Sequence, residues 1–489
     1  MHWYEVVVLI FYFLALGYLF LYSLGQLHLT FKYLKARKSQ IAEPGQLVDY
    51  PKVTIQLPVF NEKYVVQRLI DAVCKITYPK NLLEIQVLDD STDETTELAQ
   101  ERISYYKNQG IDISLIKRPV RENFKAGALA YGLKKAKGEF LAIFDADFLP
   151  AENFLESTIP HFSDMNIGMV QTRWGHINRN YSFFTRMQAF GLDAHFSIEQ
   201  TGRNSVQSFI NFNGTGGVWR RSCIEDAGGW SADTLTEDLD LSYRAQIKGW
   251  RFKYLESIES PAELPILMPA IKTQQYRWNK GAAETFRKNL KNVYKLKLPI
   301  ATKIHATFHL LNSSVFLMLL IVGVLSLPLL LIKFNHPQLE LMFKIANIFL
   351  LGFFSIAYYF WVASKRAPFT KMKENFIKTF LSFMTVSMGL SLHNGIAVLE
   401  GLIGHKTPFI RTPKFNATNE DAGNKNNSYI NYKLDVSTLA ELLLGIYFVG
   451  AMILGVYLND YGMILFHAML AIGFITVSYQ SFRSIWHGS

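Results

Sequence analysis

Two aspartates lie one residue apart inside a short apolar run, "LAIFDADFLP" at residues 141–150. If this run forms a strand, Asp145 and Asp147 point to the same face, where burying an unpaired charge would be costly. Carboxylates are the ligands that Mg²⁺ and Mn²⁺ prefer, and these ions usually share their shell with substrate phosphates. The pair therefore indicates a metal site that neutralises a leaving diphosphate. A solvated turn at a strand end is the alternative.

A further acid, Asp238, lies in "TEDLDLSYR" (236–244) at the start of a predicted helix. A carboxylate in a pocket can take the proton from an attacking hydroxyl, which makes Asp238 a candidate general base. The alternative is structural. Thr236 could cap the helix, and acids in a first turn interact favourably with the helix dipole.

The segment "QQYRW" (274–278) combines a guanidinium with an indole and precedes the group of apolar segments that begins at residue 309. Arg277 can hold phosphate oxygens through two parallel hydrogen bonds. Trp278 offers a flat apolar face on which a sugar ring could stack. The alternative is a tryptophan at a membrane interface beside a snorkelling arginine.

The elements that carry these residues alternate between short apolar strands and amphipathic helices from about residue 50 to 285. Strands are predicted at 52–60, 84–91, 112–118 and 139–148, and helices at 61–76, 92–106 and 125–137. This alternation is typical of parallel βαβ units, in which ligands bind beyond the carboxyl ends of the strands. Acids follow two of these strands, as Asp89 and Asp90 and as Asp145 and Asp147.

Long apolar segments flank this region on both sides. Runs of about 20 residues, the length that a ~30 Å hydrocarbon core requires, lie at 4–25, 309–332, 345–364, 437–458 and 461–482. The first is too long for a signal-peptide core and lacks a small-residue cleavage site, so we expect it to be retained. Basic tracts at 32–38 and 364–373 place the polar region on the cytoplasmic side and the N-terminus outside. Residues 379–399 precede another basic tract, 403–415, and are expected to be interfacial or re-entrant, with a sixth span as the alternative.

Composition narrows the class of protein further. The formal net charge is +10, which we assign to a membrane surface rather than to nucleic acid, because the helices lack the pattern of a nucleic-acid reader. Two distant cysteines, Cys74 and Cys223, exclude a disulfide framework and a cysteine-based zinc site. The sequence has no Walker loop, and "GTGGVW" (214–219) has the wrong spacing for a dinucleotide fingerprint.

Taken together and in this order, the motifs resemble the signature of processive family 2 glycosyltransferases, which include cellulose, chitin, hyaluronan and mannan synthases. These motifs are "LDD" (88–90), "DAD" (145–147), "TED" (236–238) and Gln-x-x-Arg-Trp (274–278). Residues 125–129, 171–188 and 212–230 resemble the cellulose-synthase-like glucomannan and glucan synthases more than cellulose synthase proper. Bacterial cellulose synthases typically have histidine after the "DAD" pair, where this chain has Phe148.

The resemblance implies a fold and a role for each matching residue. The fold is an α/β nucleotide-diphospho-sugar transferase domain of GT-A type, with a mostly parallel sheet, inserted between transmembrane helices. Asp238 is the implied catalytic base, and Asp145 and Asp147 the ligands of Mg²⁺ or Mn²⁺. The implied donor-binding residues are Asp89, Asp90, Lys125, Asp145, Gln274 and Arg277, and the implied acceptor-binding residues are Glu237 and Trp278.

A later segment, "FIRTPKF" (409–415), resembles the gating loop of cellulose synthases, Phe-x-Val-Thr-x-Lys-Gly. Phe409, Thr412 and Lys414 match this pattern, whereas Arg411 and Phe415 depart from it. The alternative is a basic juxtamembrane loop that binds anionic lipid.

The expected organisation follows from these segments. It comprises an N-terminal transmembrane helix (1–30), a basic linker (31–50), a cytosolic glycosyltransferase domain (51–285), an amphipathic interface segment (286–308), two transmembrane helices (309–364), an interfacial or re-entrant helix (376–402), a candidate gating loop (403–420) and two transmembrane helices (437–482). We expect a multi-pass protein of the bacterial inner membrane, or of the Golgi if the source is eukaryotic.

The expected function is that of a membrane-embedded inverting hexosyltransferase. It would polymerise hexose from UDP-glucose or GDP-mannose into a β-linked, β-1,4 glucan or mannan and extrude the chain through its helices, with accessory export proteins as further partners. One alternative is a non-processive transferase that glycosylates a membrane lipid such as diacylglycerol. A transporter or scaffold with an inactive transferase domain is a third class, against which the intact acids argue.

Overall fold

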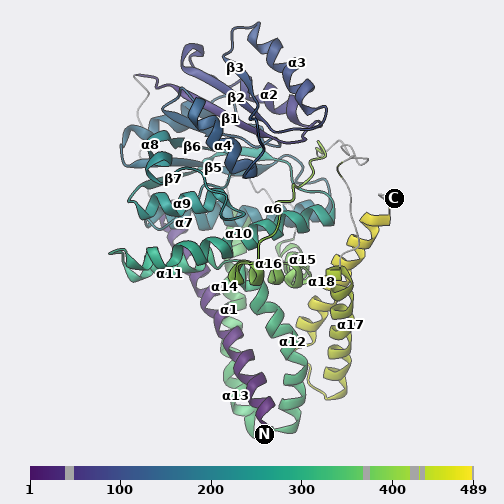
Figure 1. Cartoon of the computed structure of the whole chain (residues 1–489). Helices are drawn as coiled ribbons and strands as arrows, with labels where there is room; N and C mark the ends of the chain where they lie inside the picture. The colour runs from purple at the N-terminus through teal and green to yellow at the C-terminus, as the bar shows by residue number, and fades with distance from the viewer. Residues whose placement is uncertain (39–48, 367–374, 419–428, 430–435, 487–489) are drawn as a thin grey trace.

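In the computed structural model, an α/β domain lies at one end of the molecule and a bundle of long helices at the other (Figure 1). The structure describes residues 1–38, 49–366, 375–418, 429 and 436–486. Half of the basic linker expected at 31–50, most of the basic tract at 364–373 and the end of the candidate gating loop therefore lie outside the described residues.

Within the described residues, seven strands form one sheet in the order β3-β2-β1-β4-β6-β5-β7. The strands are β1 (Val53–Val59), β2 (Leu83–Asp89), β3 (Ile113–Ile116), β4 (Phe140–Ile143), β5 (Ile167–His176), β6 (Gly217–Arg220) and β7 (Arg251–Ala262). Neighbouring strands from β3 to β4 are parallel, as are β5 and β7, and β6 runs antiparallel to β4 and β5. The mostly parallel α/β sheet is confirmed.

The carboxyl ends of β1, β2 and β4 lie at the same edge of the sheet because these strands are parallel neighbours. Register pairs Val59 with Asp89 at the ends of β1 and β2, and β4 ends at Ile143, two residues before Asp145. The predicted strand 139–148 is therefore too long. The "DAD" pair lies in the turn that follows β4, closed by the backbone N–H of Phe148 on the carbonyl of Asp145 at 3.0 Å. Because Asp145 and Asp147 belong to a turn, their carboxylates lie outside the apolar core that surrounds the sheet.

Helices of the α/β domain pack on both faces of the sheet. They are α2 (Val66–Cys74), α3 (Thr95–Lys107), α4 (Phe124–Lys135), α5 (Phe154–Thr158), α6 (Phe183–Ala194), a π-helix (His195–Glu199), α7 (Gln200–Ser205), α8 (Arg221–Asp226) and α9 (Glu237–Ile247), with 3-10 turns at Lys80–Leu82 and Ile159–Ser163. The predicted helix 61–76 begins only at Val66, after Asn61 with a left-handed φ of 55°. Residues 61–65 therefore form a loop at the carboxyl end of β1.

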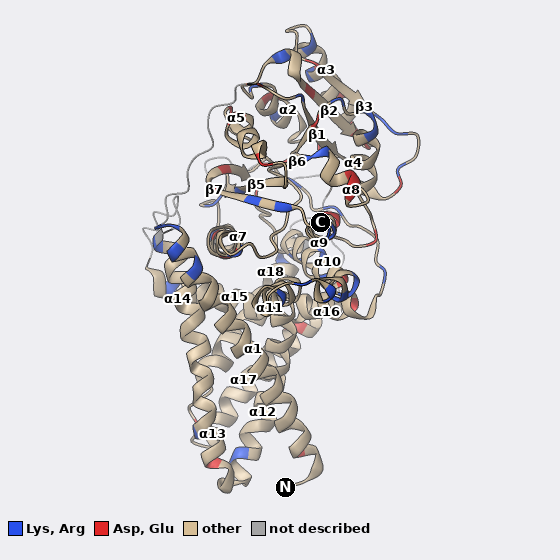
Figure 2. Cartoon of the chain, turned by 90° about the vertical axis from the view of Figure 1, so that its left-hand side faces the viewer, with Lys and Arg blue, Asp and Glu red and all other residues tan. Residues whose placement is uncertain are grey.

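Five of the described helical segments are long and apolar enough to cross a membrane. They are Trp3–Ala36 (α1), Ser314–Asn335 (α12), Pro337–Lys365, Val436–Tyr457 (α17) and Ile464–Ser484 within α18 (Ile464–Trp486). The third comprises a 3-10 turn (Pro337–Leu339), α13 (Glu340–Ala346), a 3-10 turn (Asn347–Phe349) and α14 (Leu350–Arg366). Figure 2 shows that charged residues gather on the α/β domain and near the ends of the bundle. Apolar helices thus flank the α/β domain on both sides of the sequence.

A layer of helices separates the two parts of the molecule, as both views show (Figures 1 and 2). It comprises α10 (Met268–Lys295), α11 (Ile300–Leu310), α15 (Phe376–Gly389) and α16 (Ser391–Ile403). Helices α15 and α16 form a pair bent by 53°, which would add a sixth span if the pair crossed the membrane. The boundary expected at residue 285 is corrected, because it falls within α10. That helix continues to Lys295, and the interface segment expected at 286–308 comprises its last turns and α11.

Candidate functional site

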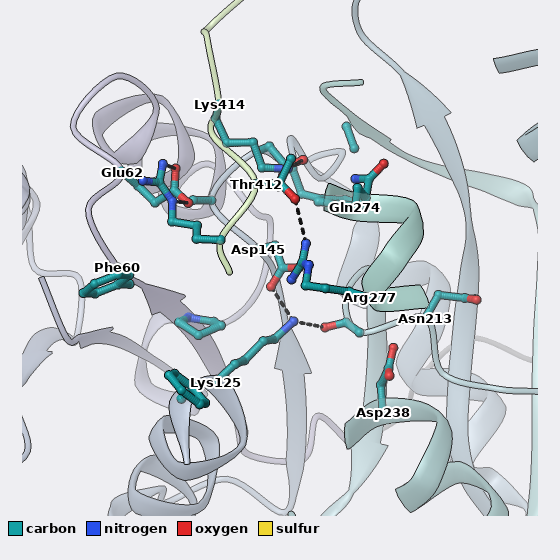
Figure 3. A pocket seen from close by; sticks show the side chains of 18 of the residues that line it. Phe60, Glu62, Lys125, Asp145, Asn213, Asp238, Gln274, Arg277, Thr412 and Lys414 are labelled. Atoms are coloured by element: carbon teal, nitrogen blue, oxygen red, sulfur yellow. Dashed lines mark hydrogen bonds and ion pairs between the residues drawn. The ribbon is translucent and has the colours of Figure 1, made fainter. Parts of the chain in front are cut away.

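One pocket opens at the carboxyl edge of the sheet and collects side chains from segments spread over most of the chain (Figure 3). Its lining includes predicted site residues from each motif: Asp90, Lys125, Asp145, Asp147, Glu237, Asp238, Gln274, Arg277, Trp278, Phe409, Thr412 and Lys414. Residues as far apart in sequence as 90 and 414 therefore converge on one space. The structure brings together every predicted site residue except Asp89.

Asp89 is buried at the end of β2 and lies outside the pocket lining. Its two carboxylate oxygens accept hydrogen bonds from the Ser91 N–H at 2.9 Å and the Thr96 hydroxyl at 2.6 Å. Asp89 therefore shapes this loop, and of the two adjacent candidates for contact with the donor, Asp90 is the one that lines the pocket. Asp90 lines the pocket, where Arg118 donates two hydrogen bonds to its carboxylate at 2.7 and 2.5 Å.

The two carboxylates of the "DAD" turn are each paired with a lysine. Lys125, from the start of α4, has its ammonium 2.6 Å from Asp145 Oδ1 and 2.8 Å from the Gly214 carbonyl (Figure 3). Lys414 has its ammonium 2.6 Å from Asp147 Oδ2. The side chain of Asp145 is 35% exposed, so this carboxylate faces open space in the pocket.

Asp238 lies in the first turn of α9, and its side chain reaches the pocket beside Gly214. Thr236 is the N-cap residue of α9, yet its side chain makes no capping hydrogen bond, so the acids are more than partners of a capped helix end. Burial, together with the like charge of Glu237, raises the pKa of Asp238 to about 7, while Lys125 opposes the shift. A group with that pKa can exchange a proton near neutral pH, as a general base must.

Gly214 permits the close approach of the base and the lysine. Its φ of +80° lies in the left-handed region, and an added Cβ would stand 3.0 Å from Asp238 Oδ2 and 3.4 Å from Lys125 Nζ. A side chain at this position would therefore be strained and would crowd two site residues. The glycine-rich stretch 214–217, which fits no dinucleotide fingerprint, serves here as a close wall of the pocket.

Helix α10 contributes Gln274, Arg277 and Trp278 to the opposite wall. Arg277 donates to the Thr412 hydroxyl at 2.9 Å, and its guanidinium lies 4.7 Å from the centre of the Phe409 ring. The indole of Trp278 lies 6.2 Å from that of Trp174, which also packs against Phe148 at 5.2 Å. The Phe148 that replaces the histidine of cellulose synthases thus belongs to an aromatic wall.

The segment 409–415 crosses the mouth of the pocket, and both its matching and its departing residues make specific contacts. Phe409 stacks on Phe124 with ring centres 5.3 Å apart, and Thr412 and Lys414 contact Arg277 and Asp147 as described. The departing Phe415 is fully buried, and its backbone N–H donates to Glu263 at 2.7 Å. This segment therefore belongs to the pocket rather than to a free juxtamembrane loop.

Sequence reasoning missed the partner of the other departing residue, Arg411. Its guanidinium donates two hydrogen bonds of 2.9 Å to the carboxylate of Glu62, 349 residues earlier in the chain. Burial raises the pKa of Glu62 to about 7, although Arg411 opposes the shift. Glu62 follows β1 just as Asp89 and Asp90 end β2, and its position in "VFNE" after an apolar strand was the available signal.

The sheet and the pocket define a transferase domain of GT-A type, and comparisons with known proteins agree. Residues 54–225 match the model of the family described as glycosyl transferase family 2, and residues 140–363 match glycosyl transferase family group 2. A mannosyltransferase from Pyrobaculum calidifontis, PcManGT, solved with GDP-Man and Mn²⁺, shares the fold. It has a TM-score of 0.50 at 19% identity, covering 75% of this chain and 99% of that one.

Curated relatives extend the likeness in sequence. Glucomannan 4-beta-mannosyltransferase 1 of Oryza sativa subsp. japonica is 44% identical over 268 residues, which are 53% of this chain and 51% of the relative. Glucomannan 4-beta-mannosyltransferase 9 of Arabidopsis thaliana is 44% identical over 244 residues, 49% and 46% of the two chains. The match thus spans about half the length of these relatives. Residues 54–363 are thus similar to family 2 glycosyltransferases, and about half of the chain is similar to glucomannan mannosyltransferases.

Proposed function

We propose that this protein is a membrane-embedded inverting hexosyltransferase that builds a β-1,4-linked polysaccharide. One observation carries the proposal: the acids after β4, the candidate base on α9 and the Arg277–Trp278 pair on α10 open onto one pocket. A scaffold with an inactive domain would have no need for this combination of an anionic centre, a base of raised pKa and a flat sugar-binding face.

The proposed reaction is one displacement at the anomeric carbon of the donor sugar. Asp238 accepts the proton from the acceptor hydroxyl, and the hydroxyl oxygen forms a bond to that carbon. The bond from the carbon to the diphosphate oxygen breaks, so the nucleoside diphosphate leaves and the configuration inverts. Arg277 holds the leaving diphosphate through its fork of donors, and Trp278 stacks the acceptor sugar.

Asp145 and Asp147 are the residues that would hold a divalent ion. A group of three histidine, cysteine or acidic side chains suited to a metal does not occur among the described residues. Two carboxylates nevertheless fit the chemistry, because Mg²⁺ and Mn²⁺ are commonly held by one or two carboxylates with substrate phosphates and water completing the shell. The lysines paired with these carboxylates place positive charge where the ion would lie, which supports this assignment. When bound, the ion would neutralise negative charge on the diphosphate.

Mannose from GDP-mannose is the favoured donor, with UDP-glucose as the second choice. The names of the glucomannan mannosyltransferases and the GDP-Man bound to PcManGT support mannose and a β-1,4 linkage. The five apolar helices and the basic tracts at 32–38 and 364–373 support a catalytic domain on the cytosolic side and a polymer extruded across the bilayer.

Product analysis tests this proposal. Protein purified in detergent is given each radiolabelled nucleotide sugar with Mg²⁺ or Mn²⁺, and a parallel sample contains EDTA. We expect a polymer that a β-1,4-mannanase degrades, and none with EDTA. A product that partitions into chloroform would show that a lipid is the acceptor and would overturn the polymerase proposal.

A further inference from the structure

Helix α10 presents two different faces. Gln274, Arg277 and Trp278, spaced i, i+3 and i+4, face the pocket. Lys272, Tyr276 and Lys280, spaced i, i+4 and i+8, form a second row. At about 100° per residue, the two rows point in roughly opposite directions. The first row is the catalytic face of α10, and we call the second its anchor face.

The first ion pair of the anchor face connects α10 to a long apolar helix. The ammonium of Lys272 lies 2.7 Å from the carboxylate of Glu441, and both side chains are buried, with exposures of 8% and 0%. Glu441 is the one charged residue in the sequence of α17 (Val436–Tyr457). His393 of α16 also contacts the Lys272 carbonyl at 3.0 Å, so α10 is held at this point by both helices.

The second ion pair lies two turns further along the same face. Lys280, which is fully buried, donates to Glu400 of α16 at 2.9 Å and to the Thr407 hydroxyl at 2.9 Å. Tyr276 donates to the same Glu400 carboxylate. Thr407 lies two residues before Phe409, so this cluster also holds the start of the 409–415 segment in position at the pocket.

Close backbone packing makes the orientation of α10 matter for the site. Gly401 of α16 lies against Lys280, where an added Cβ would stand 2.6 Å from the backbone carbonyl. On another side, an added Cβ at Gly281 would stand 2.9 Å from the backbone nitrogen of Thr236, the N-cap residue of α9. A rotation or shift of α10 would therefore displace the start of α9, which carries Asp238, together with Arg277 and Trp278.

Buried ion pairs seldom add much net stability, because desolvation of both charges offsets their attraction. An apolar contact of similar size would hold α10 against α16 and α17 about as strongly. It would, however, tolerate sliding and rotation, whereas a directional ion pair fixes one register. The two pairs sit on the same row of α10 and meet acids from two different helices, which constrains both the rotation of α10 and its position along its axis.

We infer that Glu441 and Glu400 are positioning residues, which set the orientation of α10 so that its catalytic face holds the acceptor sugar in line with Asp238. This inference rests on the proposed transferase function. It predicts that uncoupling the anchor face impairs transfer to the acceptor sugar more than hydrolysis of the donor, because water as the acceptor does not have to be oriented by Trp278.

The test compares a single and a double substitution in the full-length protein. Glu441→Gln leaves Lys272 buried without its counter-charge and should lower both the Tm and polymer synthesis, the latter at least tenfold. Lys272→Met with Glu441→Leu replaces the pair by apolar groups and should restore the Tm. Polymer synthesis should stay at least tenfold below wild type, with a raised acceptor KM, and donor hydrolysis should fall by a smaller factor than polymer synthesis.

Asp460→Asn is the matched control, because its partner Lys333, at 2.6 Å, belongs to α12 and neither residue contacts α10. We expect wild-type transfer from it. If the double variant regained both Tm and polymer synthesis, the pair would be structural only and the inference would be wrong. Should the α17 variants fail to accumulate, Glu400→Gln, whose side chain is 25% exposed, carries the same prediction, and wild-type transfer from it would also overturn the inference. A wild-type protein without hydrolysis or transfer would instead refute the proposed function.

Discussion

Lysine–carboxylate ion pairs occur both in the pocket and on the anchor face of α10, but the two sites differ in which partner comes from another segment. In the pocket, acids such as Asp145 are part of the wall and cations such as Lys125 are supplied by other segments. On the anchor face, α10 supplies the cation Lys272 and another helix supplies the acid Glu441. Two of these pairs differ in burial, since the side chain of Asp145 is 35% exposed whereas that of Glu441 is fully buried. The side chains of Asp147 in the pocket and Glu400 on the anchor face, at 6% and 25% exposed, lie between these two values.

This difference separates exchangeable from permanent ion pairs. An accessible carboxylate can replace its lysine by a metal ion or release it to a diphosphate at small cost, since exposed pairs contribute only about 0–1 kcal/mol. For a fully buried pair such as Lys272–Glu441, removing one partner costs about 3–5 kcal/mol. Asp145 can therefore exchange its lysine for a ligand charge, whereas the Lys272–Glu441 pair stays in place.

Loss of the divalent ion should have the largest effect. We expect EDTA to abolish transfer and Mn²⁺ or Mg²⁺ to restore it, and Asp147→Asn to lower kcat/KM at least ~100-fold, because a metal on the diphosphate contributes several kcal/mol of charge stabilisation. Transfer of radiolabelled sugar measures both effects. Asp112→Asn, an exposed acid paired with Lys137, is the control. Full activity in EDTA would mean that transfer does not require a divalent ion.

Substitution of Arg277 should have the next largest effect. Arg277→Lys keeps the charge but loses the planar fork, so we expect kcat/KM for the donor to fall about 10–100-fold, the equivalent of a charge-assisted hydrogen bond of about 1.5–3 kcal/mol. Steady-state kinetics measure the change. Arg251→Lys, in an exposed pair with Asp164, serves as the matched control. Equal kinetics for Arg277→Lys and wild type would mean that Arg277 only snorkels at the interface.

The pH profile should show the titration of Asp238. Because the base must be ionised and its pKa is raised to about 7, kcat/KM should increase with pH and level off above about pH 8. Glu237→Gln removes the like charge beside it, so the midpoint of the rise should move to lower pH. Rates measured from pH 5 to 9 test this shift. A midpoint that moves to higher pH, or a rise that persists in Asp238→Asn, would contradict the assignment.

Arg411→Ala should have the smallest effect. The Arg411–Glu62 pair is largely buried, with side-chain exposures of 16% and 10%, and it connects the 409–415 segment to the loop after β1. Because burial already raises the pKa of Glu62 to about 7, Glu62 can take up a proton when Arg411 is lost, which limits the cost of the substitution. The segment then has one contact fewer for the donor to displace, and we expect the KM for the donor to fall by less than about fivefold. Equilibrium binding of the nucleoside diphosphate measures the same change. A large loss of affinity would mean that Arg411 binds the donor itself.

The sequence predicted the elements whose signals are local. Alternating strands and helices, acids after strand ends and long apolar helices are each encoded within about 20 residues. The end of β4 at Ile143 was less visible, because the apolar run continues through the "DAD" turn to Phe148. The continuation of α10 past residue 285 was also missed, because the prediction divided the chain where polarity changes rather than where the helix ends.

Contacts between distant segments could not be predicted from local patterns. Arg411 departs from the gating-loop motif, so its pairing with Glu62 follows only from the tertiary structure. The same holds for Lys272, whose acid lies 169 residues away in α17. Asp89 and Asp90 are adjacent, and only the geometry of the loop shows that one shapes the turn and the other lines the pocket.

We propose above all that Asp238 is the base of the hexosyl transfer. The other pocket residues bind and orient the donor and the acceptor. Asp238→Asn tests it most directly, since the amide keeps the shape of the side chain and loses its basicity. With purified protein, donor and acceptor, we predict that transfer falls at least ~100-fold while the Kd for the nucleotide sugar stays within about threefold of wild type. Transfer by Asp238→Asn at the wild-type rate would contradict the account.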